Sequence, residues 1–237
     1  MVLLITGCSG IARATAEVAL AQGSQVLLAG LGEDCFQVDL TTHDGSDRAM
    51  AACLEKFGRI DSLFNVAGGS GRRFGDGPLH ECTEEGWSHT MDLNLQTNFR
   101  MSRAVLRHWL KLEQPGTILN MTSVLAESPE SARFATHAYA ASKAAISGMT
   151  RSMAAYYAPH RIRVNAIAPG LVATPMSSRA QSDADLLKYM ERKQPASGGI
   201  IDASEIASAA WFLLSDASRA MTGQIVTVDG GWSVTSV

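Results

Sequence analysis

Several patterns that mark specialised classes of protein are missing from this sequence of 237 residues. It has only four cysteines, none in a Cys-x-x-Cys pair and none forming a metal-like cluster with histidines: Cys8, Cys35, Cys53 and Cys82. Zinc sites and redox motifs depend on such spacings, so we expect no bound metal. We also expect all four cysteines to be reduced thiols rather than a disulfide framework.

Long apolar runs and a strong excess of charge are missing as well. The apolar run from Val2 to Ile5 stops at Thr6 and is too short for a signal peptide or a membrane span. The formal net charge of −3 gives no reason to expect a nucleic-acid partner. We therefore expect one soluble, cytoplasmic domain over residues 1–237 that binds neither nucleic acid nor membrane.

What the sequence does contain is a regular alternation of short apolar runs and helical patterns. The runs with strand character cover residues 2–5, 25–29, 35–38, 62–65, 117–121, 161–167 and 224–228. Apolar runs that alternate with helices are typical of a parallel sheet buried on both faces. The sequence therefore predicts an α/β fold, a Rossmann-type doubly wound sheet of about seven strands with ligands at their carboxyl ends.

The second and third predicted strands are separated by only five residues, 30–34. A parallel crossover normally needs a dozen residues or more. Five extended residues reach roughly 17 Å, just enough to return along one short strand. We therefore predict that the helix between strands two and three is missing and that an open loop replaces it.

A glycine-rich turn, Thr6-Gly7-Cys8-Ser9-Gly10-Ile11-Ala12, follows the first strand and leads into a helical pattern. Strand, glycine turn and helix together form the unit that holds a dinucleotide pyrophosphate at a helix N-terminus. Taken alone, the motif is also compatible with a turn that binds nothing.

Tyr139 and Lys143 stand four residues apart in a later helical pattern, which places them one turn apart on the same face. An ammonium beside a phenol favours the phenolate and lowers the tyrosine pKa toward neutrality. Such a tyrosine can donate or accept a proton at physiological pH. Without other motifs, the pair could also be an ordinary surface pair.

Five separated motifs together resemble the short-chain dehydrogenase/reductase family, in its main Tyr-x-x-x-Lys branch. They are Thr6-Gly7-x-x-Gly10, Asn65-Val66-Ala67-Gly68, Asn94, Ser123 with Tyr139 and Lys143, and Asn165 to Pro169-Gly170. The resemblance covers nearly the whole chain. It implies an NAD(P)-dependent oxidoreductase that moves hydride between nicotinamide and a secondary alcohol or ketone. It also implies a homotetramer.

The resemblance further implies a role for each site residue. Tyr139 would be the general acid in reduction and the base in oxidation, and Lys143 would lower its pKa and bind the nicotinamide ribose. Ser123 would hold the substrate oxygen, and Asn94 would position a water in a proton relay. The implied cofactor contacts are Thr6, Gly7, Ser9, Gly10, Ile11, Asp39, Leu40, Asn65, Ala67, Gly68, Tyr139, Lys143, Pro169, Gly170, Val172 and Thr174.

The sequence departs from the family pattern where the cofactor would bind. The glycine motif is one residue shorter than Thr-Gly-x-x-x-Gly-x-Gly, and Gly30 replaces the acid that usually ends strand two in NAD-preferring members. The places where NADP-preferring members usually carry a base hold Ser9 and Leu31. Glu33 and Asp34 follow in the loop, where carboxylates would repel a 2′-phosphate.

We therefore expect NAD to be the preferred cofactor, with NADP as the alternative and Arg13 as the counter-candidate for a phosphate partner. The rival from another class is a regulator that senses the dinucleotide without catalysis, but regulators on this fold typically lose the Tyr or the Lys. An enoyl reductase would space that pair further apart. Sugar alcohols, hydroxysteroids, 3-oxoacyl thioesters and small cyclic ketones all remain open as substrates.

The polar segment from Met176 to Gln194 follows the nicotinamide end of the predicted site. Long segments of this kind in compact domains are usually lids over a bound ligand. We expect residues 176–194 to be a substrate lid, with Leu186, Leu187 and Met190 as its apolar underside.

Overall fold

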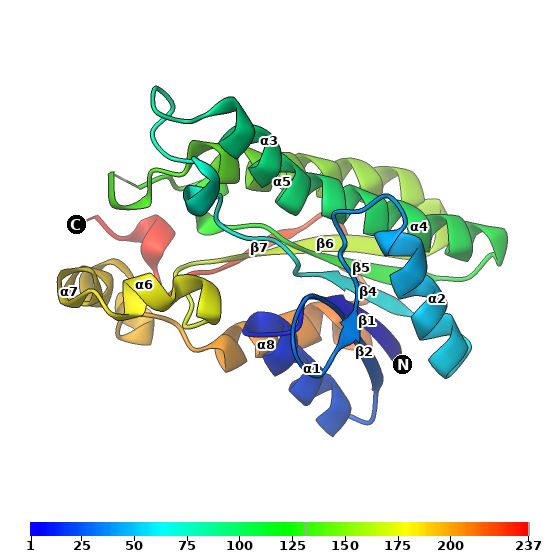
Figure 1. The fold of residues 1–237 in the computed structure, drawn as a ribbon. Helices are drawn as coiled ribbons and strands as arrows, with labels where there is room; N and C mark the ends of the chain where they lie inside the picture. The colour runs from blue at the N-terminus through cyan, green and yellow to red at the C-terminus, as the bar shows by residue number, and fades with distance from the viewer. Residues whose placement is uncertain (131, 237) are drawn as a thin grey trace.

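The computed structural model describes residues 1–130 and 132–236, and a single parallel sheet lies at its centre (Figure 1). In this part of the chain, seven strands pair in the order β3-β2-β1-β4-β5-β6-β7. The strands are β1 Val2–Thr6, β2 Gln25–Gly30, β3 Phe36–Gln37, β4 Ser62–Asn65, β5 Gly116–Met121, β6 Ile162–Pro169 and β7 Ile225–Val228. The order reverses between β1 and β4, as in a doubly wound Rossmann-type sheet, so the predicted fold class is confirmed.

Helices cover both faces of this sheet. The helices are α1 Ile11–Ala21, α2 Gly45–Phe57, α3 Glu84–Met91, α4 Thr97–Lys111, α5 His137–Tyr157, α6 Ser178–Gln181, α7 Ala184–Lys193 and α8 Ala203–Leu214. Figure 1 shows α1 and α8 on one face and α2, α4 and α5 on the other. The central strands β1 and β4 therefore bury every residue on both sides, which explains their uninterrupted apolar runs, whereas the edge strands β3 and β7 stay partly exposed.

The alternation of side chains along β1 divides the core into two halves. Leu4 joins the cluster under α2 and α4, whereas Leu3 and Ile5 join the cluster under α1 and α8. Successive residues of a strand point to opposite faces, so one apolar run supplies both clusters.

The buried indole N–H of Trp109 donates to the Ile60 carbonyl at 2.7 Å. This bond removes the free-energy cost of burying an unpaired donor.

The connection from β2 to β3 is an open loop, residues 31–35, and contains no helix. β3 has only two residues and pairs through Ala29 with Phe36 and Gly30 with Gln37. The predicted absence of the crossover helix is therefore confirmed. Its consequence is that the loop after β2 is exposed over residues 31–34.

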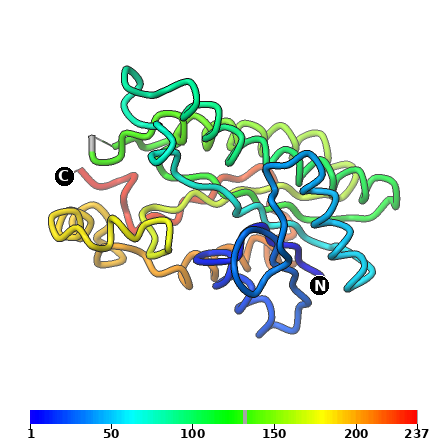
Figure 2. The backbone as a smooth tube through the Cα atoms, viewed as in Figure 1, coloured from blue at the N-terminus to red at the C-terminus, as the bar shows by residue number. Residues whose placement is uncertain are grey.

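Four segments that are far apart in the sequence meet near the ends of β5 and β6: the loops 69–83 and 124–136, the α6–α7 region and the C-terminus (Figure 2). Arg72 donates to the Arg133 carbonyl at 3.0 Å and the Trp232 indole donates to the Ser128 carbonyl at 3.1 Å. A small separate apolar cluster forms there from Val124, Leu186, Met190 and Trp232. Among the described residues, no helix has the length and apolarity needed to cross a membrane.

Candidate active site

The glycine turn between β1 and α1 leaves backbone donors open at a helix N-terminus. Gly7 has a φ of +98° and Gly10 a φ of +54°, which side chains rarely allow. A Cβ at Gly10 would come within 2.8 Å of Thr174 Cγ2, so only glycine lets the turn approach the segment after β6. α1 has no side-chain cap and no acidic residue in its first turn. An uncapped helix start of this kind fits a dinucleotide pyrophosphate.

The end of β1 is tied to the end of β4 by Thr6. Its buried hydroxyl oxygen accepts the backbone N–H groups of Val66 at 2.9 Å and Ala67 at 3.0 Å. The next residue, Gly68, lies so close to the α4 side that a Cβ would come within 2.5 Å of Asn94 Oδ1. The Thr6 hydroxyl thus fixes how the Asn65–Gly68 motif leaves the sheet.

Asn94 lies in a π-helical turn, Asp92–Gln96, between α3 and α4 and is fully buried. Its side-chain amide donates to the carbonyls of Gly69 and Thr90, both at 2.9 Å, and its oxygen accepts the Gly69 N–H at 3.1 Å. Widened turns of this kind are frequent at functional sites, where they redirect a side chain or backbone group. Asn94 therefore holds the Gly68–Gly69 backbone next to the Lys143 ammonium.

Ser123, Tyr139 and Lys143 come together at the carboxyl end of β5. Ser123 follows β5, and its hydroxyl hydrogen-bonds the Tyr139 phenol from α5. One helical turn on, Lys143 Nζ lies 5.5 Å from the Tyr139 ring centroid and donates to the Met121 carbonyl at 3.0 Å. The predicted shared face of Tyr139 and Lys143 is confirmed, and Gly68 connects it to Asn94.

Burial dominates the titration of this pair. It disfavours the ammonium and lowers the pKa of Lys143 to about 8. It raises the pKa of Tyr139 above its ordinary value, and the hydrogen bond with Ser123 acts in the opposite direction. The expectation that Lys143 would bring the tyrosine pKa toward neutrality is therefore wrong for this structure. Burial therefore favours the protonated phenol.

Asp76 supports the start of α5 and was not singled out in the sequence. Its two carboxylate oxygens accept the backbone N–H groups of Ala138 and Tyr139, each at 3.0 Å, and the residue is almost fully buried. Thr136, the residue at the N-cap position, makes no side-chain cap. Carboxylates stabilise helix N-termini through such bonds. Because Asp76 lies 62 and 63 residues away from its partners, no local pattern could have indicated this role.

Replacing Asp76 by Ala is expected to lower the free energy of unfolding by about 2 kcal/mol, because two buried N–H groups lose their acceptor. Urea unfolding measures this change, and hydrogen exchange at Ala138 and Tyr139 should accelerate. Asp76→Asn is the matched control: it keeps one acceptor oxygen and should have a smaller effect. Unchanged protection of both amides in Asp76→Ala would contradict the assignment.

At the expected adenine end, the side chains are engaged within the protein. Asp39 accepts the backbone N–H and the hydroxyl of Thr41, at 2.9 and 2.6 Å, which lowers its pKa. Leu40 is buried. The Asn65 amide donates to Ser102 and Asn120, both at 3.0 Å, and its buried oxygen has no partner within the described residues. Asn65 thus braces β4 against β5 and α4.

The expected nicotinamide end lies after β6, in residues 169–174. Gln194 clamps this turn: its side chain accepts the Leu171 N–H at 2.6 Å and donates to the Leu171 and Gly199 carbonyls at 3.1 and 2.7 Å. Val172 is buried and forms a parallel bridge with Ile201. Thr174 follows and reaches Gly10. The glycine turn, where the pyrophosphate is expected, and the expected nicotinamide end are therefore adjacent in space.

The predicted lid segment contains α6 and α7. Leu186 and Met190 are buried in the apolar cluster with Val124 and Trp232, whereas Leu187 is 36% exposed. Leu187 is therefore not part of that cluster. Tyr189 on α7 donates to Glu130 at 2.6 Å, so this helix also contacts the loop 124–136.

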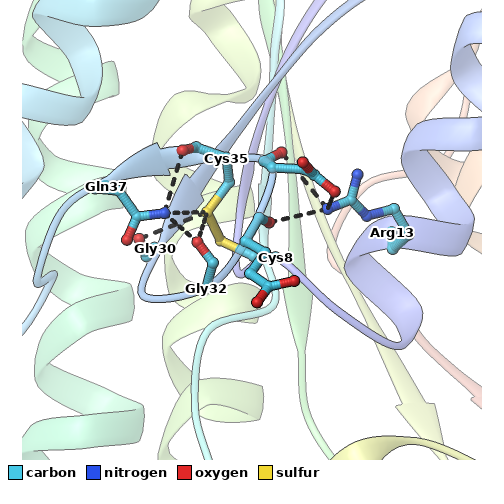
Figure 3. The surroundings of a disulfide bond; sticks show 8 residues. Cys8, Arg13, Gly30, Gly32, Cys35 and Gln37 are labelled. Atoms are coloured by element: carbon cyan, nitrogen blue, oxygen red, sulfur yellow. Dashed lines mark hydrogen bonds and ion pairs between the residues drawn. A yellow bond between two sulfur atoms is a disulfide. The ribbon is translucent and has the colours of Figure 1, made fainter.

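Cys8 and Cys35 form a disulfide, with their Cα atoms 5.9 Å apart, while Cys53 and Cys82 are free (Figure 3). The expectation of four reduced thiols is wrong for this pair. The reason is the missing helix, because the short loop 31–35 brings the chain back beside the glycine turn. Cys35 therefore contacts Cys8 although the two have a sequence separation of 27.

Comparison with known proteins bears directly on this arrangement. A family model described as enoyl-(acyl carrier protein) reductase matches residues 6–233. The short-chain reductase protein NovJ of Streptomyces niveus is 34% identical over 252 residues, covering 97% of this chain and 93% of NovJ. The 3-oxoacyl-(acyl-carrier-protein) reductase FabG of Vibrio cholerae is 34% identical over 245 residues, covering 97% of this chain and 96% of FabG.

Solved structures are similar over the same extent. Levodione reductase has a TM-score of 0.88 at 29% identity and covers 99% of this chain and 98% of its own. 4-Hydroxyisoleucine dehydrogenase complexed with NADH has a TM-score of 0.88 at 26% identity and covers 99% of each chain. An actinorhodin polyketide ketoreductase with NADPH has a TM-score of 0.85 at 26% identity and covers 98% of this chain and 97% of its own. With a family model matched over nearly its full length and relatives above 30% identity, the chain belongs to the short-chain dehydrogenase/reductase family.

Proposed function

We propose that this oxidoreductase transfers hydride between a nicotinamide dinucleotide and a secondary alcohol or ketone. The observation that carries the proposal is the contact of Ser123 with Tyr139, and of Tyr139 with Lys143, at the same carboxyl edge of the parallel sheet as the uncapped start of α1. A proton donor, a hydroxyl to hold the carbonyl oxygen and a cation are the groups that carbonyl reduction needs. The dinucleotide, when bound, supplies or accepts the hydride.

Each site residue has a separate role in the proposed ketone reduction. The Ser123 hydroxyl hydrogen-bonds the substrate oxygen, and the Tyr139 phenol donates its proton to that oxygen as charge develops there. The buried Lys143 ammonium stabilises the phenolate that remains. Asn94 holds the Gly68–Gly69 backbone beside Lys143 and positions a water through which the proton is replaced from solvent. In alcohol oxidation the same protons move in the opposite direction.

The carbonyl class is favoured over the reduction of a C=C bond. The matched family model is described as an enoyl reductase, and that branch of the family spaces its tyrosine and lysine further apart. Here Tyr139 and Lys143 are one helical turn apart, as in the ketone-reducing branch. Purified protein offered NADH or NADPH with ketones, sugars, 3-oxoacyl thioesters and enoyl thioesters tests this choice. Turnover of enoyl thioesters alone would overturn it, and binding without any turnover would favour a dinucleotide-sensing regulator.

NAD is expected to be preferred over NADP. Arg13, the candidate phosphate partner, already donates to the Glu33 carbonyl at 3.1 Å and lies 3.9 Å from the Asp34 carboxylate. Carboxylates at positions 33 and 34 would repel a 2′-phosphate. The measurement is the ratio of kcat/KM with NAD to kcat/KM with NADP. Asp34→Asn should lower this ratio toward one. A clear preference of the wild-type enzyme for NADP would mean that Arg13 leaves Asp34 and binds the phosphate.

Residues 176–194 are expected to close over the substrate. Ser177, Gln181 and the start of α7 are partly or fully exposed, whereas Leu186 and Met190 are buried in the apolar cluster, with Ala180 and Tyr189 packed against it. Hydrogen exchange should therefore be faster here than in the sheet, and should slow when cofactor and substrate bind. If the segment is already as protected as β5 in the free enzyme, it is a fixed wall and not a lid.

The assembly and location proposed for the chain are a homotetramer and the cytoplasm. A homotetramer is supported by the fact that members of this family commonly form homotetramers. Light scattering on the purified protein gives the assembly directly, and a mass of one or two chains would reject the tetramer.

A further inference from the structure

The Cys8–Cys35 disulfide joins two parts of the proposed dinucleotide site. Cys8 is in the glycine turn, between Gly7 and Gly10, where the pyrophosphate is expected. Cys35 ends the loop 31–35 that follows β2, where this family reads the adenosine ribose. Figure 3 shows the disulfide between the turn and the loop, with Arg13 on one side and Gln37 on the other.

Few other interactions hold the loop in place. Residues 31–34 are exposed, and β3 beyond them pairs with β2 at only two positions. Arg13 contacts the loop through the carbonyls of Glu33 and Asp34, at 3.1 and 3.5 Å, but these bonds are at the surface. Gln37 donates to the Cys35 carbonyl at 3.3 Å and to the Gly32 carbonyl. The disulfide is the covalent restraint on a loop that has no helix behind it.

The close approach of the loop 31–35 to Cys8 depends on the S–S bond being intact. A Cβ at Gly32 would come within 2.9 Å of Cys8 Cβ, and one at Gly30 within 3.2 Å of Cys8 Sγ. Backbone and sulfur are therefore in close contact. Two sulfurs that are no longer bonded need van der Waals separation of roughly 3.5–4 Å, so an open pair pushes the loop away from the turn.

A reduced Cys35 thiol would also have hydrogen-bond acceptors beside it. Its sulfur lies 3.4 Å from the Gly32 carbonyl and 3.6 Å from the Gly30 carbonyl. A disulfide sulfur carries no proton and cannot donate to them, but a thiol can. Cys35 is partly exposed whereas Cys8 is 9% exposed, so a reductant reaches the Cys35 sulfur more easily.

We propose that the Cys8–Cys35 disulfide is a redox-controlled clasp on the dinucleotide site, and that its reduction releases the loop 31–35 and weakens dinucleotide binding. The inference rests on the proposed function. The reductant is a dithiol, such as a thioredoxin-class protein or dithiothreitol. Its two thiols give up two electrons and two protons: the protein S–S bond breaks, two cysteine thiols form, and the reductant becomes a disulfide.

The reduced protein should bind the dinucleotide more weakly because binding must then order the loop 31–35. With the clasp closed, the loop and the glycine turn are already positioned before the dinucleotide arrives. With it open, binding must first restrict a loop that moves freely, and part of the binding free energy is spent on that. In reducing compartments, disulfides that do occur are usually catalytic or redox-sensing rather than structural, which agrees with a regulatory role.

The test compares oxidised and dithiothreitol-reduced full-length protein, with the number of free thiols counted in each state. Titration with NADH and with NADPH, followed by nicotinamide fluorescence, gives the dissociation constants. We expect two free thiols and tight binding before reduction, then four free thiols and binding of the preferred dinucleotide weakened about tenfold. Hydrogen exchange without dinucleotide should accelerate over residues 31–37 on reduction.

Two variants serve as controls. Cys8→Ser with Cys35→Ser should bind as the reduced wild type does and should not respond to dithiothreitol. Cys82→Ser leaves the clasp intact and should respond as the wild type does. Equal dissociation constants in the two redox states, or four free thiols in the protein after air oxidation, would overturn the clasp while leaving the proposed function standing. Absence of any dinucleotide binding in both states would overturn the proposed function as well.

Discussion

Replacing Tyr139 by Phe is expected to lower kcat by about 10²- to 10⁴-fold and to leave the dissociation constant of the dinucleotide nearly unchanged. The substitution removes one hydroxyl, which hydrogen-bonds Ser123 and is the proposed proton donor, and keeps the ring beside Lys143. In the proposed site the dinucleotide pyrophosphate lies at the glycine turn and the α1 N-terminus, which the substitution does not touch. Steady-state kinetics and a cofactor titration on the same preparation give both quantities.

Tyr156→Phe is the matched control for this experiment. Tyr156 is on the same helix, α5, is 70% exposed and lies at the end of the helix far from Ser123. Its replacement should leave kcat within about twofold of the wild type, since it contacts no site residue. A Tyr139→Phe enzyme with near-wild-type kcat would contradict the assignment of the proton donor. Loss of dinucleotide binding in Tyr139→Phe would point to a general disruption of the site instead.

Opening the disulfide is expected to destabilise the protein by about 3–4 kcal/mol. The bond closes a loop with a sequence separation of 27, and the chain-entropy relation for a loop of that length gives this magnitude. For a domain of this size the melting temperature should fall by roughly 7–10 °C. Thermal unfolding of the oxidised wild type, the reduced wild type and Cys8→Ser with Cys35→Ser measures the difference.

The reduced wild type and the double variant should melt together, below the oxidised protein. Cys82→Ser should melt with the oxidised wild type, because Cys82 is a free and partly exposed thiol. Identical melting of the oxidised and reduced wild-type protein would mean that the Cys8–Cys35 disulfide does not stabilise the folded protein. It would also remove one of the physical supports for a redox effect on binding.

The overall fold could be predicted because its determinants are local. The seven apolar runs are each short enough to be strands, and the interval of only five residues, 30–34, was enough to exclude a crossover helix. The pairing of Tyr139 with Lys143 follows from helical periodicity. Their neighbours Ser123 and Asn94 were placed by resemblance to a family, and the structure brings all four residues to one end of the sheet.

What could not be predicted depends on where separate segments meet. The disulfide requires the path of a loop in space, and the support of α5 by Asp76 joins positions more than 60 residues apart. The pKa of Tyr139 depends on how deeply α5 packs, and burial there outweighs the neighbouring cation. Leu187 is a smaller case: helical periodicity allows two adjacent residues on one apolar face, and only the packing of α7 shows that Leu186 is buried in the cluster while Leu187 is exposed.

Hydride transfer itself is the most direct test of the proposed function. The reduced dinucleotide, carrying deuterium at the transferable position of its nicotinamide, is incubated with the enzyme and a panel of ketones. The mass of each alcohol product is then measured. We expect one deuterium at the carbinol carbon of at least one product, formed by the wild type and Tyr156→Phe at similar rates and by Tyr139→Phe only at a small fraction of that rate. Tight binding of the dinucleotide with no deuterium in any product would contradict an enzyme acting on ketones.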